Sequence, residues 1–157
     1  MSTNKRDLAV EVTSHGGRLA DLTPSECLAL LAGEEIGRVV YCDRLGPLAV
    51  PVNFALDQGT IVFRTAPDNA LAAHLRESST CSFEVDRIDP ATRSGWSVVV
   101  RGSAALVRHP GGASGLTWPV PWPDGSRQFV IRITPLEVTG RRLVTPPPDR
   151  WPGPTPD

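Results

Sequence analysis

Short apolar runs separated by turn signals constrain the fold of this chain more than any other feature of its sequence. The runs alternate between apolar and polar residues or are rich in β-branched residues, and turn-forming residues follow at 43–47 and 57–59. About seven strands are expected, at 36–42, 48–56, 60–65, 80–86, 95–107, 128–134 and 137–144. Because so many antiparallel strands leave exposed edges unless the sheet closes on itself, the pattern predicts a mainly β fold, an antiparallel barrel.

Two short helices are expected to interrupt the strands. Thr23 suits the N-cap of a helix that starts at Pro24, Glu26 completes a capping box, and Gly33 ends the helix. The second helix is expected to start at Asp68, a good N-cap residue, and to run to about residue 76. Helices this short leave the fold mainly β.

Proline marks the edges of the expected domain. Of the 16 prolines in the 157 residues, six lie in 146–157 and four lie between 109 and 126. Because proline fixes φ and lacks an N–H donor, we expect 146–157 to be an extended tail. Residues 1–20 are expected to be an N-terminal extension, and 21–145 the barrel domain. Pro51, inside an expected strand, favours an edge or a bulge over a central position.

Charge and composition exclude several classes of protein. A net charge of −1 lacks the strongly basic character of a nucleic-acid binder, and no apolar run reaches the roughly 18 residues of a membrane helix. The N-terminus lacks the apolar segment of a signal peptide. Cys27, Cys42 and Cys81 are odd in number and far apart, which indicates reduced thiols in a cytoplasmic protein, with Cys42 and Cys81 as small core residues. No motif indicates a metal site.

Three stretches combine side chains that suit a ligand. Asn53 follows Pro51 and lies on the strand face opposite the apolar set. Arg64 ends a strand just before a helix, where a guanidinium and backbone donors suit a phosphate. Trp96 and Ser97 stand at a strand start, on opposite faces. Each has a simpler structural interpretation: a turn contact for Asn53, a surface charge for Arg64, and core packing for Trp96.

The order of these motifs along the chain is more informative than any one of them alone. Taken together, they resemble the pyridoxamine 5′-phosphate oxidase-like family, the FMN-binding split barrels, and within it a short bacterial branch similar to nitroimidazole reductases. The resemblance runs from about residue 22 to residue 143. Its motifs lie at 22–28, 36–39, 51–54, 62–65, 82–86, 95–102, 121–122 and 138–142.

The resemblance implies a split antiparallel barrel that forms a homodimer, with FMN at the subunit interface and a small-molecule substrate. It implies flavin-dependent oxidoreductase activity, in which a nicotinamide cofactor is the electron donor, and it assigns no catalytic side chain. The residues that it assigns to the cofactor are Pro51, Val52, Asn53, Phe54, Arg64, Thr65, Asn69, Trp96, Ser97, Trp122 and Arg142.

One departure from the family pattern leaves two other functions open. Ala70 stands where similar proteins often have a lysine that neutralises the cofactor phosphate. The carboxylate of Asp68 would compete with that phosphate for the same backbone donors. The alternatives are a deazaflavin-dependent reductase on the same fold and a non-catalytic binding protein that has lost tight cofactor binding.

Overall fold

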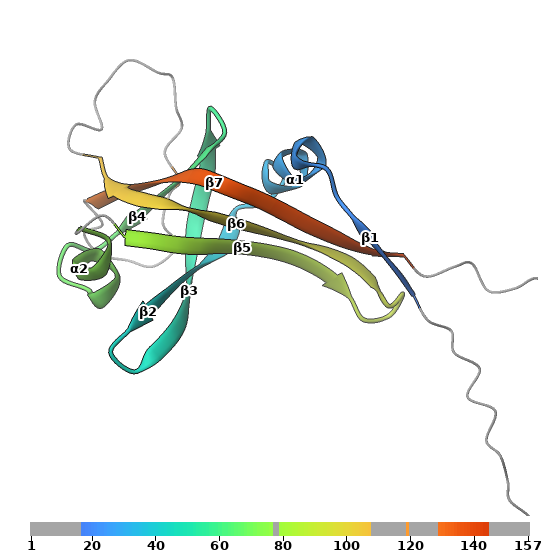
Figure 1. Ribbon diagram of the computed structural model, residues 1–157, viewed down its shortest axis with the longest axis horizontal. Coiled ribbons are helices and arrows are strands. Elements are labelled where there is room, and N and C mark those ends of the chain that lie inside the picture. The colour runs from blue at the N-terminus through green and yellow to red at the C-terminus, as the bar shows by residue number, and fades with distance from the viewer. Residues whose placement is uncertain (1–16, 77–78, 108–118, 120–128, 145–157) are drawn as a thin grey trace, which may run out of the picture.

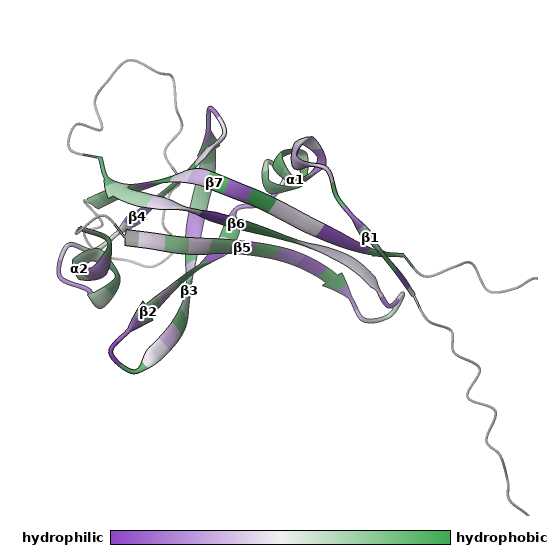
Figure 2. Cartoon of the chain, viewed as in Figure 1, coloured by the Kyte–Doolittle hydropathy of each residue, from purple (hydrophilic) through white to green (hydrophobic). Residues whose placement is uncertain are grey.

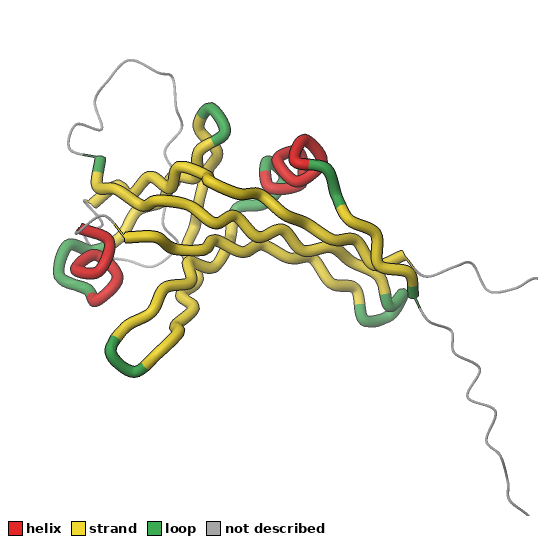
Figure 3. Tube along the Cα trace, in the orientation of Figure 1, coloured by secondary structure: helices red, strands yellow, loops and turns green. Residues whose placement is uncertain are grey.

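The computed structural model describes residues 17–76, 79–107, 119 and 129–144. This part of the chain holds seven strands and two helices (Figure 1). Figure 3 shows how small the helical share is. The elements are β1 (Arg18–Asp21), α1 (Pro24–Leu31), β2 (Ile36–Asp43), β3 (Gly46–Asp57), β4 (Thr60–Thr65), α2 (Ala70–Arg76), β5 (Ser79–Asp89), β6 (Ser94–Leu106) and β7 (Phe129–Val144).

The strands form one antiparallel sheet that closes into a barrel. Their order is β1-β7-β4-β3-β2-β5-β6, and β6 pairs back onto β7 to complete the ring. The edge of β7 that does not face β6 pairs with two strands: β4 pairs with the first five residues of β7, and β1 pairs with its last four. Between those two stretches no described strand covers that edge, so the barrel is split there. The split antiparallel barrel expected from the sequence is confirmed.

Alternation along the strands builds the core. Figure 2 shows hydrophobic and hydrophilic residues along the same strands. The inward side chains are buried, and at their centre the rings of Phe54 and Phe83 pack edge to face with centroids 4.9 Å apart. The two helices cover the ends of the core with Cys27 and Leu31 from α1 and with apolar side chains from α2.

Local signals fix α1 as the sequence predicts. The Glu26 N–H donates to Oγ1 of Thr23 over 3.3 Å, and the Thr23 N–H donates to Oε2 of Glu26 over 2.7 Å, so the capping box is complete. The N–H and the hydroxyl of Thr23 both donate to Oε2 of Glu26, and they lower the pKa of Glu26 below its usual range. The helix packs on Gly140 of β7, where a Cβ would lie only 2.6 Å from Sγ of Cys27.

Several sequence-based predictions are corrected. The two strands expected at 128–134 and 137–144 are one strand, β7, because a bulge accommodates Pro135: Arg101 pairs with Glu137 and Gly102 pairs with Pro135, which leaves Leu136 unpaired. No strand was expected at 18–21, where β1 lies. Cys42 is exposed on the hairpin of β2 and β3 and is not a core residue.

Candidate functional site

Arg64 is the most unusual polar side chain at the end of β4. Its Nε is buried and has no hydrogen-bond partner among the described residues. Arg132, on the neighbouring strand, provides the contrast. Its guanidinium contacts Oδ2 of Asp57 and Oγ1 of Thr60, each over 2.6 Å. The guanidinium of Arg132 is therefore hydrogen-bonded within the chain, while the buried Nε–H of Arg64 has no partner among the described residues.

The turn after β4 is locked by a side-chain pair. Nδ2 of Asn69 donates to Oγ1 of Thr65 over 2.7 Å, and Oδ1 of Asn69 accepts from the Ala72 N–H over 2.7 Å. Asn69 is thus the N-cap of α2, and the helix begins at Ala70, which corrects the predicted start and cap at Asp68. Because Asn69 occupies the cap, the Ala72 N–H donates to Asn69 and not to the carboxylate of Asp68.

None of the described residues is a lysine that could offset the alanine at position 70. Ala70 is exposed at the first position of α2, and the single lysine of the sequence is Lys5. Of the described residues, Arg64 is the arginine at this strand end, and it would supply the positive charge for an anion held at this turn.

β3 offers a free edge beside Arg64. It pairs with β4 only over Phe54–Asp57, so no described strand covers that edge from residue 46 to residue 53. Pro51 lies in this stretch, which confirms its predicted edge position. The last paired residues of β3 and β4 are Phe54 and Phe63. Asn53 and Arg64 are the next residues along each strand, at the point where β3 and β4 separate. The side chain of Phe54 itself is 4% exposed and packs in the core.

Trp96 and Arg142 are brought together far from that edge. They are direct cross-strand partners on β6 and β7, and Trp96 also pairs with Arg87 on β5. Trp96 packs against the core, and Ser97 points to the opposite, outer face, as predicted. Trp122 lies outside the described residues.

The expected cofactor residues therefore form two separate groups within one chain. Arg64 pairs with Val130 near the start of β7, and Trp96 pairs with Arg142 near its end. Those positions lie twelve residues apart along β7, a contour of roughly 40 Å at about 3.3 Å per residue. Figure 1 shows β7 running along the molecule from beside β4 to beside β1.

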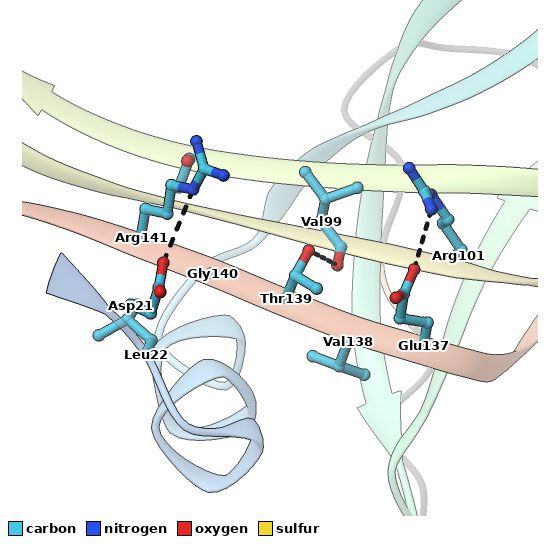
Figure 4. A pocket seen from close by; sticks show the side chains of 10 residues that line it. Asp21, Leu22, Val99, Arg101, Glu137, Val138, Thr139, Gly140 and Arg141 are labelled. Carbon is cyan, nitrogen blue, oxygen red and sulfur yellow. Dashed lines mark hydrogen bonds and ion pairs between the residues drawn. The ribbon is translucent and has the colours of Figure 1, made fainter. Parts of the chain in front are cut away.

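A groove on the outer face of β6 and β7 was not predicted as a unit. Its volume is about 600 Å³, and Figure 4 shows its lining residues. Ion pairs stand at its two ends: Arg101 with Glu137 at 3.0 Å, and Arg141 with Asp21 at 3.8 Å. The sequence signal that could have indicated this groove is the set of alternate residues, pointing away from the core, in the expected strands 95–107 and 137–144. The remaining lining residues are Leu22, Ser97, Val99, Val138, Thr139 and Gly140.

The described residues hold neither a metal-binding cluster nor a membrane-spanning helix. They hold no cluster of three or more His, Cys, Asp or Glu side chains that could bind a metal ion. None of their helices is long and apolar enough to cross a membrane.

The comparisons with known proteins agree with this fold. The family model described as pyridoxamine 5′-phosphate oxidase matches residues 23–142. The Mycobacterium tuberculosis protein Rv0080, described as uncharacterized, is 33% identical over 131 residues, which are 80% of this chain and 86% of that protein. The structure of an FAD binding protein from Mycobacterium smegmatis is 30% identical, with a TM-score of 0.63 over 80% of this chain and 98% of that one. A protein of unknown function from Corynebacterium diphtheriae is also 30% identical, with a TM-score of 0.59 and the same coverage of both chains.

These matches cover the barrel and the motifs that position Arg64, Asn53 and Trp96. The family expected from the ordered motifs is thereby confirmed: this chain belongs to the pyridoxamine 5′-phosphate oxidase family.

Proposed function

We propose that this protein binds FMN and catalyses flavin-dependent oxidation and reduction of a small organic acceptor. The observation that carries the proposal is the buried Nε of Arg64, which has no partner among the described residues. A buried donor without a partner costs about 1–3 kcal/mol, and an anion placed there would remove that cost. The relative named as an FAD binding protein supports a flavin phosphate as that anion.

The phosphate end of FMN fits the turn between β4 and α2. Arg64 would supply the positive charge. Oγ1 of Thr65 accepts from Asn69, so the Thr65 hydroxyl keeps its hydrogen for donation to phosphate. The amide of Asn69 is fully engaged by Thr65 and Ala72, so Asn69 would hold the turn in place.

The ring end would lie at the edge of β3 that no described strand covers, with Pro51, Val52 and Asn53 beside the flavin. The second group, Trp96 and Arg142 with Ser97 next to them, lies too far along β7 for one FMN to contact both groups in a single chain. We therefore propose a homodimer in which the second group comes from the partner subunit. Trp122 belongs to the proposed set on the family resemblance alone.

The chain's own part in the reaction is binding and orientation. FMN, when bound, supplies the two-electron chemistry, and a nicotinamide cofactor is the proposed electron donor. The edge of β3 that no described strand covers would hold the ring, and polar groups of that edge would meet the polar rim of the ring. We assign no acid or base side chain, because hydride transfer by a flavin needs positioning more than a protein nucleophile.

A second candidate function is favoured by Ala70. Without a lysine at the phosphate, the affinity for FMN rests largely on Arg64. Weak FMN affinity would favour the deazaflavin-dependent reductase, and no affinity for either cofactor would favour the non-catalytic binding protein.

The test is a parallel titration of flavin-free protein with FMN, FAD and a deazaflavin cofactor, followed by fluorescence. Arg64→Gln should weaken FMN binding about 10-fold to 100-fold, since hydrogen bonds to charged groups contribute about 1.5–3 kcal/mol. Arg44→Gln, in the exposed turn between β2 and β3, is the matched control and should change nothing. Equal FMN affinity of all three proteins would overturn the phosphate assignment.

A further inference from the structure

β3 has an open edge on the hairpin that it forms with β2. Figure 1 shows this hairpin projecting from the rest of the barrel. Before Phe54, β3 pairs with β2 on one side and with no described strand on the other. Pro47, Ala49 and Pro51 are exposed along this stretch. Open strand edges pair readily with other chains, so soluble proteins carry features that prevent such pairing.

The register shows which backbone groups face the open edge. In an antiparallel strand, successive residues direct their N–H and C=O groups to opposite sides. The Phe54 N–H donates to the Glu35 carbonyl over 2.9 Å, and the register of β2 with β3 runs without a shift from there to Gly46. The even-numbered residues of β3 therefore face β2, and residues 47, 49 and 51 face the open edge.

Two of these three outward positions hold proline, which has no N–H to donate. An antiparallel contact between two such edges, with Ala49 opposite its own copy, would use three outward N–H groups from each copy, six in all. Pro47 and Pro51 remove four of the six, so only the two bonds of Ala49 remain. A strand added to this edge would leave most of the ladder unmade.

No charge protects this edge in the same way. Residues 46–56 contain no charged side chain, and none of the described residues is a lysine, which often guards such edges. The stretch is mostly apolar, and Leu48 is 41% exposed. Neutral apolar strands without proline are prone to aggregate. The two prolines are therefore the features of 46–56 that oppose strand pairing.

We propose that Pro47 and Pro51 prevent the β3 edge of one copy from pairing with the same edge of a second copy. The edge then stays open to a small molecule, which needs only a few of its backbone groups. That this small molecule is the flavin rests on the proposed function, whereas the barrier to strand pairing does not. The test therefore uses flavin-free protein, and a failed FMN titration would leave its result unchanged.

The first experiment restores the missing donors. Pro47→Thr combined with Pro51→Thr should self-associate about 100-fold more strongly than the wild type in sedimentation, because each edge contact regains four hydrogen bonds. Pro24→Ala, at the exposed start of α1, controls for the general effect of removing a proline and should sediment as the wild type does. A double variant that folds and sediments as the wild type would overturn the proposal.

The second experiment separates edge pairing from misfolding. Ala49→Lys, added to the double variant, should return the particle to the wild-type size, because like charges would stand opposite each other in the paired edges. Assemblies that persist after this change would show that the chains associate by another route, which would refute the assignment of the edge.

Pro47→Thr alone carries the test if the double variant does not fold. Position 47 pairs with exposed Cys42 beside the turn, outside the core. Its restored N–H and that of Ala49 can form four bonds when Leu48 stands opposite its own copy. We expect self-association about tenfold stronger than that of the wild type, and an unchanged association constant would contradict the proposal.

Discussion

Asn69→Ala tests the lock that positions the proposed phosphate site. The substitution removes the N-cap of α2, which costs about 1 kcal/mol, and it removes the donor to a Thr65 hydroxyl that is only 2% exposed, which costs about 1–3 kcal/mol. We expect a total loss of roughly 2–4 kcal/mol, a large part of the 5–15 kcal/mol typical of a domain. Urea unfolding followed by circular dichroism should show a lower midpoint with an unchanged slope.

Asn69→Asp separates stability from ligand binding at the same position. Its carboxylate still accepts from the Ala72 N–H, and the Thr65 hydroxyl can turn to donate to it, so the stability loss should stay below about 1 kcal/mol. The new negative charge should weaken FMN binding about tenfold or more, because like charges a few ångströms apart repel by roughly 1–4 kcal/mol. The reasoning is refuted if Asn69→Ala unfolds at the wild-type midpoint, or if Asn69→Asp binds FMN as tightly as the wild type.

Three further predictions follow from packing, charge and burial. Gly37→Ala should lower the thermal midpoint by roughly 2–10 °C, because its Cβ would lie 2.3 Å from Cζ of Phe83; an unchanged melting curve would contradict the packing. Ala70→Lys should tighten FMN binding about threefold to tenfold in a low-salt titration and less at high salt; no gain would mean that the phosphate lies elsewhere. Alkylation read by mass spectrometry at pH 8 should modify exposed Cys42 well before Cys81, since burial raises the pKa of Cys81 to about 11 and keeps it a thiol below that pH; equal rates would contradict this.

Local signals made part of the fold predictable. The capping box of Thr23 and Glu26 uses residues three apart, so the sequence alone contains the whole motif, and α1 forms as expected. The strand at 60–65 is bounded by a turn signal on one side and by proline on the other, and β4 has those bounds. Such elements depend on neighbours in the chain.

Long-range pairing made other parts unpredictable. Arg18–Asp21 has only two apolar residues, and it becomes β1 because the end of β7 offers an unpaired edge. Pro135 looks like a strand break, yet the bulge opposite Arg101 and Gly102 carries β7 past it. Asp68 and Asn69 are both good caps, and the bond from Asn69 to Thr65 on β4 selects the second of them.

The sequence predicted which motifs belong to the candidate site, but it did not predict how their residues are arranged in space. The order of the motifs indicated the family, which the comparisons confirm. Sequence spacing did not reveal that Trp96 and Arg142 are direct partners, nor that a long stretch of β7 separates them from Arg64. It also did not reveal that Phe54 faces the core, since that depends on which face of β3 the barrel encloses.

The central claim is that this protein binds a flavin, and the visible absorbance spectrum of freshly purified protein tests it most directly. We expect a yellow protein that releases a compound with the mass of FMN on denaturation, or one that turns yellow on addition of FMN and keeps it through desalting. Release of a deazaflavin would replace FMN with the alternative cofactor. A colourless protein that retains no FMN, FAD or deazaflavin would contradict the account.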